Sequence, residues 1–548
     1  MKLTKLFTAL AAVTLLVAGC EKKSEMDKFI DNLMSKMTLE EKLGQLNLPS
    51  CPSEIVTGNE KCENILENIR AGRVGAILNT YGYDNIMPYQ KAAVEESRLG
   101  IPLLTGLDVI HGHKTVFPIP LGLAATWNPE AIEEAARLAA LESTADGINW
   151  TYNPMVDITR DPRWGRCAEG AGEDPYLGGV VAQAMVRGYQ GTPEELYNGN
   201  ERMLACVKHF ALYGGAASGL DYTEVDMSPA RMYNEYLPPY KAAIDAGVGS
   251  IMTSFNDING MPSTANKWLF TEVLRNQWGF DGFVVSDYNA EGELIRHRVA
   301  ADKVEAGVAA FNAGLDMDMV TASCLELEAA VKDGRVSMET IDRACRNVLE
   351  AKYKLGLFEN PYKHLDKSLS ERIFTDESRA IARKVTAESF VLLKNDGAQL
   401  KAIFMTHGHH DHRECMAELK ENCDAPIYMG RQDIAQFHME GLEEFKDKET
   451  FEIGEMKIFA FHTPGHTPGG FCFKCEDMLI SGDTLFAGTI GRTDLPGGDY
   501  DIIMKSLTVI AEIVGKQNPK VMPGHAHFST FGQEKVQNPY LKEAIKCL

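Results

Sequence analysis

The sequence predicts an α/β protein with two dissimilar parts, a (β/α)8 TIM-like barrel followed by a smaller α/β unit. From about Met26 to Tyr362, short apolar runs that end in glycine or polar residues alternate with stretches of helical periodicity. The apolar runs do not alternate with polar residues, which is typical of parallel strands covered on both faces. From Lys401 onward this pattern stops and histidine-rich motifs begin. The chain therefore divides near residue 400.

Length, composition and charge limit the classes of protein to consider. A chain of 548 residues exceeds one ordinary domain of ~100–200 residues and predicts about three units. Its 45% hydrophobic and 24% charged residues are typical of a globular fold. The formal net charge of -22 opposes binding to phosphate backbones, so nucleic acid is excluded as a partner. The oligomeric state is unknown at this level.

The N-terminal residues 1–20 are predicted to be a lipoprotein signal peptide. Lys2 and Lys5 precede an apolar run over 6–18 that is too short to span a bilayer, and Gly19 and Cys20 follow. The end of this segment resembles a bacterial lipobox, which implies cleavage before Cys20 and a lipid on its sulfur. An ordinary secretory signal and an uncleaved anchor are the alternatives. We expect a periplasmic or cell-envelope protein held to the membrane through this lipid.

The elements of the first part follow in order along the chain. Strands are predicted at the apolar runs Val74–Leu78, Ile101–Leu104, Leu204–Val207, Ser250–Met252 and Gly282–Val285. Helices are predicted between them, for example over Pro129–Thr144 and Lys267–Trp278. A span of roughly 330 residues favours a barrel with insertions, and an open doubly wound sheet is the alternative.

Polar residues fall where several of these strands are expected to end. Asp108, Lys208, His209, Asn256 and Asp287 each come directly after an apolar run. In a barrel of parallel strands the carboxyl ends converge on one face, where active sites are built. A helix cap or a solvated loop is the alternative for each residue alone. Their number favours a shared site.

Six motifs then occur in a characteristic order: Gly106–Gly112, Asp161–Arg166, Gly172–Tyr176, Val207–Phe210, Asn256–Gly260 and Gly282–Tyr288. Together they resemble glycoside hydrolase family 3, in particular its periplasmic β-glucosidase-like members. The resemblance extends over about residues 26–396 and assigns the N-terminal barrel of that family to 26–362. It implies a β-glucoside or oligosaccharide substrate and no cofactor.

The resemblance also implies roles for individual residues. Asp287 is expected to be the nucleophile, giving a covalent glycosyl-enzyme and net retention of configuration. The sugar is expected to be bound by Asp108, Arg166, Lys208, His209 and Tyr288. The neighbouring cations would lower the pKa of Asp287 and keep it ionised. Two alternatives stay open: Arg166 in a salt bridge with Glu173 or Asp174, and Tyr288 in the core.

The proton donor of such an enzyme is missing from the sequence. In two-domain relatives that glutamate lies in a second domain, of which residues 363–399 keep only the opening, ending in Ser389–Gly397. Single-domain relatives carry a histidine in the loop after the Val207–Phe210 motif, and this chain has none there. Asp221 and Glu224 lie nearby in the sequence, but nothing in the sequence favours either of them as the proton donor. We expect weakened activity that fails on alkyl glycosides before aryl glycosides.

Residues 400–548 carry a second set of motifs at the ends of apolar runs: Thr406–His412, Thr463–His466, Ser481–Thr484 and Pro523–His525. They resemble the metallo-β-lactamase superfamily, especially its glyoxalase II-like hydrolases. The resemblance implies two zinc ions, with iron as the alternative. The expected ligands are His407, His409 and His466 for one ion, Asp411, His412 and His525 for the other, and Asp483 as the bridge.

This αββα unit is expected to be incomplete, because the strands that precede the His-x-His motif in relatives are absent. Such a loss would leave strand edges unpaired. The junction between Asn395 and Leu400 has no linker and is typical of a chimeric fusion. Three hypotheses follow: an exported retaining β-glycosidase, a binuclear-metal hydrolase of thioesters or other acyl bonds, and an inactive sugar-binding lipoprotein.

Overall fold

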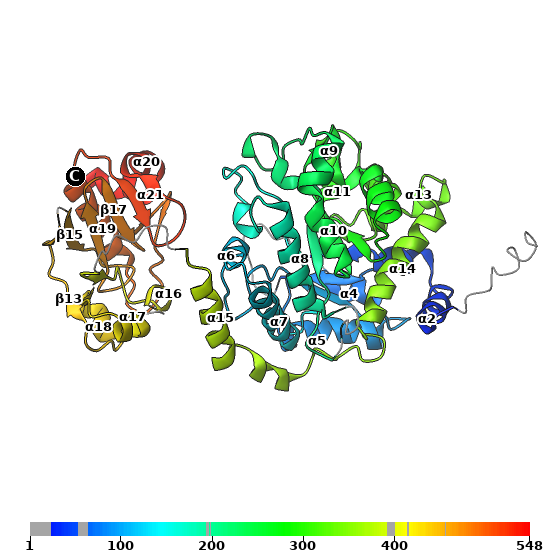
Figure 1. Cartoon of the computed structure of the whole chain (residues 1–548), viewed down its shortest axis with the longest axis horizontal. Coiled ribbons are helices and arrows are strands. Elements are labelled where there is room, and N and C mark those ends of the chain that lie inside the picture. Colours follow the sequence, from blue (N-terminus) through cyan, green and yellow to red (C-terminus); the bar gives the residue numbers. More distant parts are fainter. Residues whose placement is uncertain are drawn as a thin grey trace, which may run out of the picture. The chain divides into compact units, whose positions relative to one another are not determined.

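The computed structural model describes residues 23–52, 64–192, 197, 199–391, 400–413, 416–454 and 456–547. The signal segment with Cys20 lies outside these residues. The chain forms two compact units, Met1–Val391 and Leu392–Leu548, which are described separately below (Figure 1). Within the described residues, no helix is both long enough and apolar enough to cross a membrane.

The first unit contains a ring of short parallel strands. In its described residues these are β1 (Asn47–Leu48), β2 (Ala76–Leu78), β3 (Leu104–Leu107), β4 (Trp150–Thr151), β5 (Cys206–Phe210), β6 (Ser250–Thr253), β9 (Phe283–Val285) and β10 (Asp318–Met319). Parallel ladders join β1 to β10, β2 to β3 and β4, and β5 to β6 and β9. Parallel bridges join the remaining neighbours, at Ser50–Leu78, Trp150–Leu204 and Val285–Met317. The pairing returns to its start, and we call this set the strand ring.

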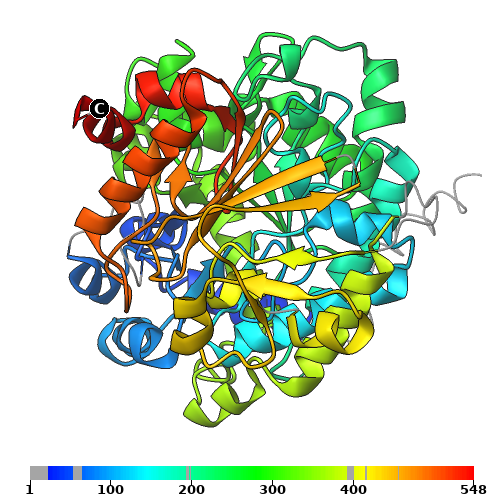
Figure 2. The same cartoon turned by 90° about the vertical axis from the view of Figure 1, so that its left-hand side faces the viewer.

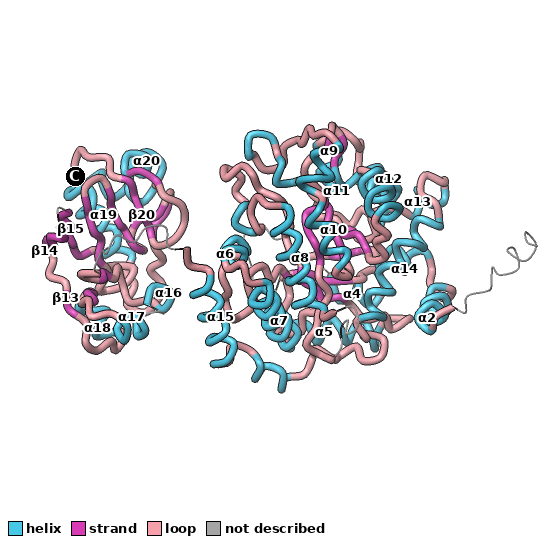
Figure 3. Tube along the Cα trace, in the orientation of Figure 1, coloured by secondary structure: helices cyan, strands magenta, loops and turns pink. Residues whose placement is uncertain are grey.

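Helices surround the strand ring (Figure 3). The main ones are α2 (Glu25–Met34), α3 (Leu39–Gln45), α4 (Ile65–Arg70), α5 (Tyr83–Lys91), α6 (Pro120–Ala125), α7 (Pro129–Ala145), α8 (Pro175–Gln190), α10 (Pro238–Asp245), η7 (Trp268–Gln277), α11 (Ala290–Arg296), α12 (Lys303–Ala313), α13 (Glu328–Lys332), α14 (Met338–Lys354) and α15 (Asp376–Glu388). Local sequence fixes where several begin: the Asn128 side chain caps α7 ahead of Pro129, and Asp174 caps α8. Each helix buries an alanine-rich or glycine-rich face, and Gly188 of α8 packs closely against Ala136 of α7.

The α/β class predicted from the sequence is confirmed, with shifts in detail. The helix predicted over Pro129–Thr144 is α7, and that over Lys267–Trp278 is η7, a π-type helix. The strand predicted at Ile101–Leu104 begins only at Leu104. Lys208 and His209 lie within β5, not after it as predicted. Their side chains are buried by tertiary packing, which a local pattern of apolar residues does not reveal.

Buried aromatic rings fill the strand ring. Trp150 is fully buried and contacts Tyr152 and Phe283 edge to face. Its indole nitrogen donates a hydrogen bond to Ser250 at 2.9 Å, so this buried polar atom is satisfied. The interior of the strand ring is therefore a packed core.

The second unit contains two sheets and flanking helices (Figure 2). One sheet has the order β14 (Glu449–Ile453), β15 (Met456–His462), β16 (Phe471–Cys475), β17 (Met478–Gly482), β20 (Lys520–Pro523) and β21 (Ser529–Thr530). The other is β11 (Ile403–Phe404), β12 (Ile427–Met429) and β13 (Glu443–Glu444). A hairpin joins β18 (Leu485–Phe486) to β19 (Thr489–Ile490). The helices are α16 (His410–Arg413), α17 (Met416–Asn422), α18 (Arg431–Gln436), α19 (Tyr500–Val514), α20 (Phe531–Gln537) and α21 (Pro539–Ala544).

The core of this unit lies between the larger sheet and α19. Phe461, Leu479 and Val521 of the sheet pack with Leu507 and Ile510 of the helix, and all five are fully buried. Burying each of these side chains contributes about 1.5–3 kcal/mol. The loops that follow β11, β15, β17 and β20 extend from this framework.

Candidate functional site

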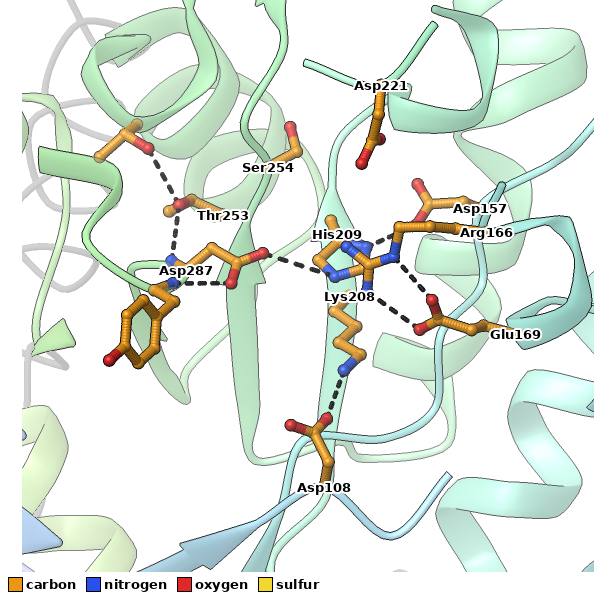
Figure 4. A network of polar contacts seen from close by, with 12 residues as sticks. Asp108, Asp157, Arg166, Glu169, Lys208, His209, Asp221, Thr253, Ser254 and Asp287 are labelled. Atoms are coloured by element: carbon orange, nitrogen blue, oxygen red, sulfur yellow. Dashed lines mark hydrogen bonds and ion pairs between the residues drawn. The ribbon is translucent and has the colours of Figure 1, made fainter. Parts of the chain in front are cut away.

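The predicted sugar-site residues of the first unit gather beside the ends of three strands (Figure 4). Asp108 follows β3 directly, Lys208 and His209 lie in β5, and Asp287 comes two residues after β9. Arg166 reaches the same group from the turn before η2 (Cys167–Glu169). Parallel strands thus bring together side chains that are far apart in sequence.

Asp287 has a carboxylate held at one oxygen only. The backbone N–H of Tyr288 donates to its Oδ1 at 2.6 Å, and its own N–H donates to Thr253 Oγ1 at 3.2 Å. Oδ2 is buried without a hydrogen-bond partner and lies 3.5 Å from Nε2 of His209. Burial raises the pKa of Asp287 to about 6, although Lys208 lowers it. Lys208 and Arg166 lower the pKa of Asp287, as expected, but desolvation outweighs both cations and leaves the pKa above its ordinary value.

His209 is held in place by a buried carboxylate that sequence reasoning missed. Asp157 Oδ2 lies 2.9 Å from His209 Nδ1 and accepts the His209 backbone N–H at 3.0 Å. Tyr240 donates its hydroxyl to Asp157 Oδ1 at 2.6 Å. Burial lowers the pKa of His209 well below its usual range, so its imidazole is neutral. Only the fold brings Asp157 to this position.

Lys208 and Asp108 form an ion pair at the edge of the site. Lys208 Nζ donates to Asp108 Oδ1 at 2.5 Å, and the lysine side chain is 5% exposed while that of the aspartate is 52% exposed. Asp108 therefore keeps acceptor capacity on its solvent side for the hydroxyl groups of a ligand. Lys208 is fixed as a buried positive charge next to Asp287.

Arg166 pairs with a carboxylate that neither its predicted role in sugar binding nor the alternative salt bridge named. Its Nε and Nη2 donate to the two oxygens of Glu169 at 2.7 and 2.9 Å, so the alternative partners Glu173 and Asp174 are not used. The guanidinium also lies 5.7 Å from the centre of the Tyr213 ring. Glu169 lies three residues after Arg166 in a short turn. This spacing is the one feature of the sequence that could have predicted the pair. The pair orients Arg166 as a planar donor.

Tyr288 and Asp221 complete the surroundings of Asp287. The Tyr288 ring is partly buried and packs against a cluster that includes Trp164, which favours the core alternative for this residue. Trp164 donates its indole N–H to Asp221 at 2.8 Å. Figure 4 shows the Asp221 carboxylate facing the space between Ser254 and Arg166. Asp221 is thus oriented by a buried ring.

In the second unit, all seven predicted metal ligands come together. Three groups of possible ligand atoms, each within 4.8 Å of one another, are His407 with His409 and His466, His407 with His412 and Asp483, and Asp411 with His412 and His525. They come from the loop after β11, from α16, and from the loops after β15, β17 and β20. His407 and His412 link the groups into one cluster.

Several nitrogen and oxygen atoms of this cluster are arranged as a cation would require. His409 Nδ1 lies 2.9 Å from His466 Nε2, and His412 Nε2 lies 3.2 Å from His525 Nε2. His407 Nε2 and Asp483 Oδ1 are buried with no hydrogen-bond partner. Burial, with the neighbouring histidines, lowers the pKa of His407 to about 2, so its imidazole is neutral. Neutral imidazoles and carboxylates that converge in this way are the donor set of Zn²⁺ or Fe.

The family of the chain follows from comparison with known families. Residues 38–351 match the glycosyl hydrolase family 3 N-terminal domain. The chain belongs to glycoside hydrolase family 3. Residues 374–525 match the metallo-beta-lactamase superfamily, so this family 3 member also carries a domain of that superfamily.

Curated relatives share the first unit of this family 3 chain. The periplasmic beta-glucosidase of Salmonella typhimurium is 45% identical over 375 residues, which cover 67% of this chain and 48% of the relative. A beta-xylosidase of Formosa agariphila is 36% identical over 383 residues, covering 68% and 48%. The chain spans about half the length of the curated relatives it matches.

Solved structures give the same result. The beta-glucosidase from Listeria innocua is 40% identical with a TM-score of 0.65, covering 70% of this chain and 54% of that one. Its complex with glucose matches at 36% identity and a TM-score of 0.68, covering 78% and 61%. A b-glucosidase from Erythrobacter marinus is 28% identical with a TM-score of 0.67, covering 75% and 59%.

The family 3 chain holds its histidine cluster in place through a residue that no sequence motif indicated. Asp433 of α18 is fully buried and accepts the backbone N–H of Gly408 at 2.8 Å and that of Gly469 at 2.6 Å. Thr467 also donates to it at 2.8 Å. Asp433 therefore connects the loop of His407 and His409 to the loop of His466.

Proposed function

We propose that the first unit is a retaining β-glycosidase of the β-glucosidase type that hydrolyses O-glycosyl bonds in carbohydrate catabolism. The observation that carries the proposal is the buried, unpartnered Oδ2 of Asp287, surrounded by Lys208, His209 and Arg166. The closed pairing of the strand ring supports a (β/α)8 barrel over residues 26–362, in which such strand ends form the active site. The glucosidase and xylosidase relatives support the substrate class.

The geometry suits attack on a sugar carbon. Asp287 uses Oδ2 to form a bond to the anomeric carbon while the bond from that carbon to the departing oxygen breaks. Lys208 and Arg166 stabilise the ionised carboxylate, whose pKa burial raises to about 6. Water then releases the sugar from Asp287, with retention at the anomeric carbon. Asp108, with its exposed carboxylate beside Lys208, accepts a sugar hydroxyl.

The test of this function is the Asp287→Asn variant. Asparagine keeps the shape of the side chain and removes the nucleophile, so hydrolysis of nitrophenyl β-glucoside is expected to fall by at least about 10³-fold. A fluorinated glucoside should label Asp287 in the parent, as located by peptide mass. Asp281→Asn changes an aspartate whose side chain is 84% exposed and serves as the control. Undiminished turnover by Asp287→Asn would contradict the proposal.

The departing oxygen needs a proton, and we propose that this chain lacks the usual donor. Residues 363–399 are the remnant of the domain that supplies it in longer relatives. Loss of general acid catalysis costs about 10²–10⁴-fold with poor leaving groups and much less with nitrophenol. The ratio of rates on nitrophenyl and methyl β-glucoside should therefore exceed that of a full-length relative by about that factor. An equal loss on both substrates would contradict an acid deficiency.

Export and lipid attachment are part of the proposal. Residues 1–20 would act as the signal peptide and Cys20 would carry the lipid, which places the protein in the periplasm or cell envelope. The name of the periplasmic relative supports export. Labelling with radioactive palmitate should be lost in Cys20→Ser. Labelling that persists in that variant would exclude Cys20 as the site.

The clustered ligands favour a second candidate function, a binuclear-metal hydrolase of the glyoxalase II type in residues 400–548. His407, His409, His466, Asp411, His412, His525 and Asp483 would hold two zinc ions, or iron. When bound, such ions activate water for attack on a thioester or other acyl bond. Metal content and chelator-sensitive thioesterase activity test this function. The three-stranded sheet of β11, β12 and β13 supports an incomplete αββα unit.

A third candidate is a sugar-binding lipoprotein without turnover. It predicts saturable binding of glucose to the parent chain together with no hydrolysis of any glucoside. Two features of Asp287 argue against this third candidate. Its pKa is raised by burial, and its Oδ2 is buried without a hydrogen-bond partner. Carboxylates with perturbed pKa values are typical of catalytic sites.

A further inference from the structure

The loop that follows β3 carries Asp108, and we call its residues 108–117 the β3 loop. At its start, Lys208 Nζ donates to Asp108 Oδ1 at 2.5 Å (Figure 4). The Tyr189 hydroxyl donates to the carbonyl oxygen of Val109 at 3.1 Å. These two contacts hold only the first two residues of the loop, so the residues beyond them need a support of their own.

Glu142 of α7 supplies this support. Its side chain is buried, and Oε2 accepts the backbone N–H of Thr115 at 2.7 Å and that of Lys114 at 3.0 Å. Oε1 accepts the Thr115 hydroxyl at 2.6 Å. Hydrogen bonds that a carboxylate accepts are shorter and stronger than those between neutral groups. One buried side chain therefore fixes two consecutive residues of the β3 loop.

A fourth hydrogen bond to Glu142 comes from the segment that precedes α15. The backbone N–H of Phe374 donates to Glu142 Oε1 at 2.8 Å, although the two residues are 232 positions apart. The φ of Phe374 is 56°, in the left-handed region that is uncommon for a bulky side chain. Such strain persists only where the surrounding contacts require it, and the bond to Glu142 is one of them. The segment before α15 thus takes part in holding the β3 loop.

A second carboxylate at the end of α7 binds the same loop. Asp146, the residue after α7, has its Oδ2 2.7 Å from Nε2 of His113, whose side chain is 5% exposed. The chain turns sharply just before His113, because Gly112 has a φ of 107° and a Cβ there would overlap the carbonyl oxygen of Thr115. Two carboxylates from one helix end therefore hold the middle of the β3 loop.

We propose that Glu142 is a positioning residue for the sugar-binding carboxylate of Asp108. Glu142 is buried and acts through the β3 loop, whose far end it fixes so that Asp108 stays beside Lys208 with its free oxygen toward the sugar. The inference rests on the proposed glycosidase function and adds to it a residue that controls sugar binding from a distance. It also gives the segment before α15 a role, because Phe374 completes the hydrogen bonds of Glu142.

A double-mutant cycle on glucose binding, measured by calorimetry with the full chain, tests this coupling. Asp108→Asn removes the charge of the acceptor and should weaken glucose binding by about tenfold. Glu142→Gln replaces one acceptor oxygen by a donor that faces N–H groups, and should weaken it by about tenfold as well. The double variant should bind within about twofold of Asp108→Asn, since both changes act on one contact. Glu134→Gln, on the same helix with a side chain that is 36% exposed, is the matched control.

Kinetics on nitrophenyl β-glucoside distinguish positioning from general damage to the fold. Glu142→Gln should raise KM by about tenfold and leave kcat within about twofold, because it removes binding that the substrate and the transition state share. A loss of folded protein would instead lower kcat per mole of chain and leave KM unchanged. Thr115→Val removes only the hydroxyl bond to Glu142 and is the milder second variant, with an expected rise in KM of about threefold.

The contrary results are distinct from one another. Losses of affinity that add to about 100-fold in the double variant overturn an action through Asp108, and so does an unchanged glucose affinity in Glu142→Gln. A lower kcat with unchanged KM in both Glu142→Gln and Thr115→Val shows a structural role alone and also overturns the inference. A parent chain that binds no glucose counts against the proposed glycosidase function itself and removes the inference with it.

Discussion

The chemistry that we propose for the first unit depends on one buried carboxylate, Asp287. Asp287 is buried, and the cations beside it do not fully compensate for the loss of water around its charge. The ionised form of Asp287 that the proposed function needs is therefore the form that destabilises the fold. Two measurable consequences follow.

The first consequence concerns the pH profile. A nucleophilic carboxylate must be ionised, and burial raises the pKa of Asp287 to about 6 from 3.8. We expect kcat/KM on nitrophenyl β-glucoside to rise with pH through about 6 and to lose about tenfold per unit below it. An acidic limb near 4 would contradict the effect of burial on this residue.

The second consequence concerns stability. A raised folded-state pKa gives a carboxylic acid a favourable contribution below about 4 that is lost as pH rises through about 6. Asp287→Asn removes the ionisation penalty, so this variant, which we expect to be inactive, should be more stable than the parent at pH 7–8 by up to about 3 kcal/mol. Asp157→Asn is the contrast: Asp157 is equally buried but accepts hydrogen bonds from Tyr240 and His209, so its loss should destabilise. Chemical denaturation at pH 5 and 8 measures both.

At the scale of elements, helix packing places a lysine in the core. Lys352 of α14 is fully buried, and its Nζ donates to Gln45 of α3 at 2.7 Å. Burial lowers the pKa of Lys352 to about 7, far below that of an unfolded chain. The unfolded state then binds more protons between about pH 7 and 10, so stability should rise with pH across that interval.

Replacing both partners tests this effect. Gln45→Leu with Lys352→Met removes the buried polar pair without leaving an unsatisfied group, and should stabilise the first unit by about 1–3 kcal/mol at pH 6. The rise in stability between pH 7 and 10 should disappear. Lys354→Met, two residues away and 35% exposed, is the control. A double variant that keeps the pH slope of the parent would show that another group causes it.

In the second unit, α18 positions the candidate metal ligands through Asp433. Asp433→Asn replaces one acceptor oxygen by a donor that faces the N–H groups of Gly408 and Gly469. We expect affinity for Zn²⁺ to fall by about 10–100-fold while the seven ligands remain in the chain. Competition with a zinc-binding dye measures this affinity. Glu444→Gln, at a side chain that is 48% exposed on β13, should leave it unchanged.

At the scale of the whole molecule, the two units should respond separately to metal. If Zn²⁺ binds the folded second unit as proposed and not the unfolded chain, metal at 100 times its Kd should stabilise that unit by about 2.7 kcal/mol. Calorimetry with Zn²⁺ and with chelator should move one thermal transition and leave that of the first unit in place. His525→Ala should abolish the shift, and His527→Ala, at an exposed histidine outside the ligand groups, should not. One transition that moves as a whole would contradict independent units.

Many features of this protein could be predicted from the local pattern of residues along its sequence. Apolar runs predicted β2, β3, β5, β6 and β9 of the strand ring but not β1, β4 or β10, Asn128 and Pro129 marked the start of α7, and short motifs indicated seven candidate metal ligands that the structure brings together. These features depend on neighbouring residues, so they can be read along the chain. The same motifs predicted both family memberships.

Contacts between distant segments were decided only by the tertiary structure. Asp157 and Asp433 carry no local signal because their partners lie far away in sequence. The raised pKa of Asp287 could not be predicted either, since desolvation depends on everything packed around a group. Sequence determines which side chains are present at strand ends; packing determines how much water and how many partners each one keeps.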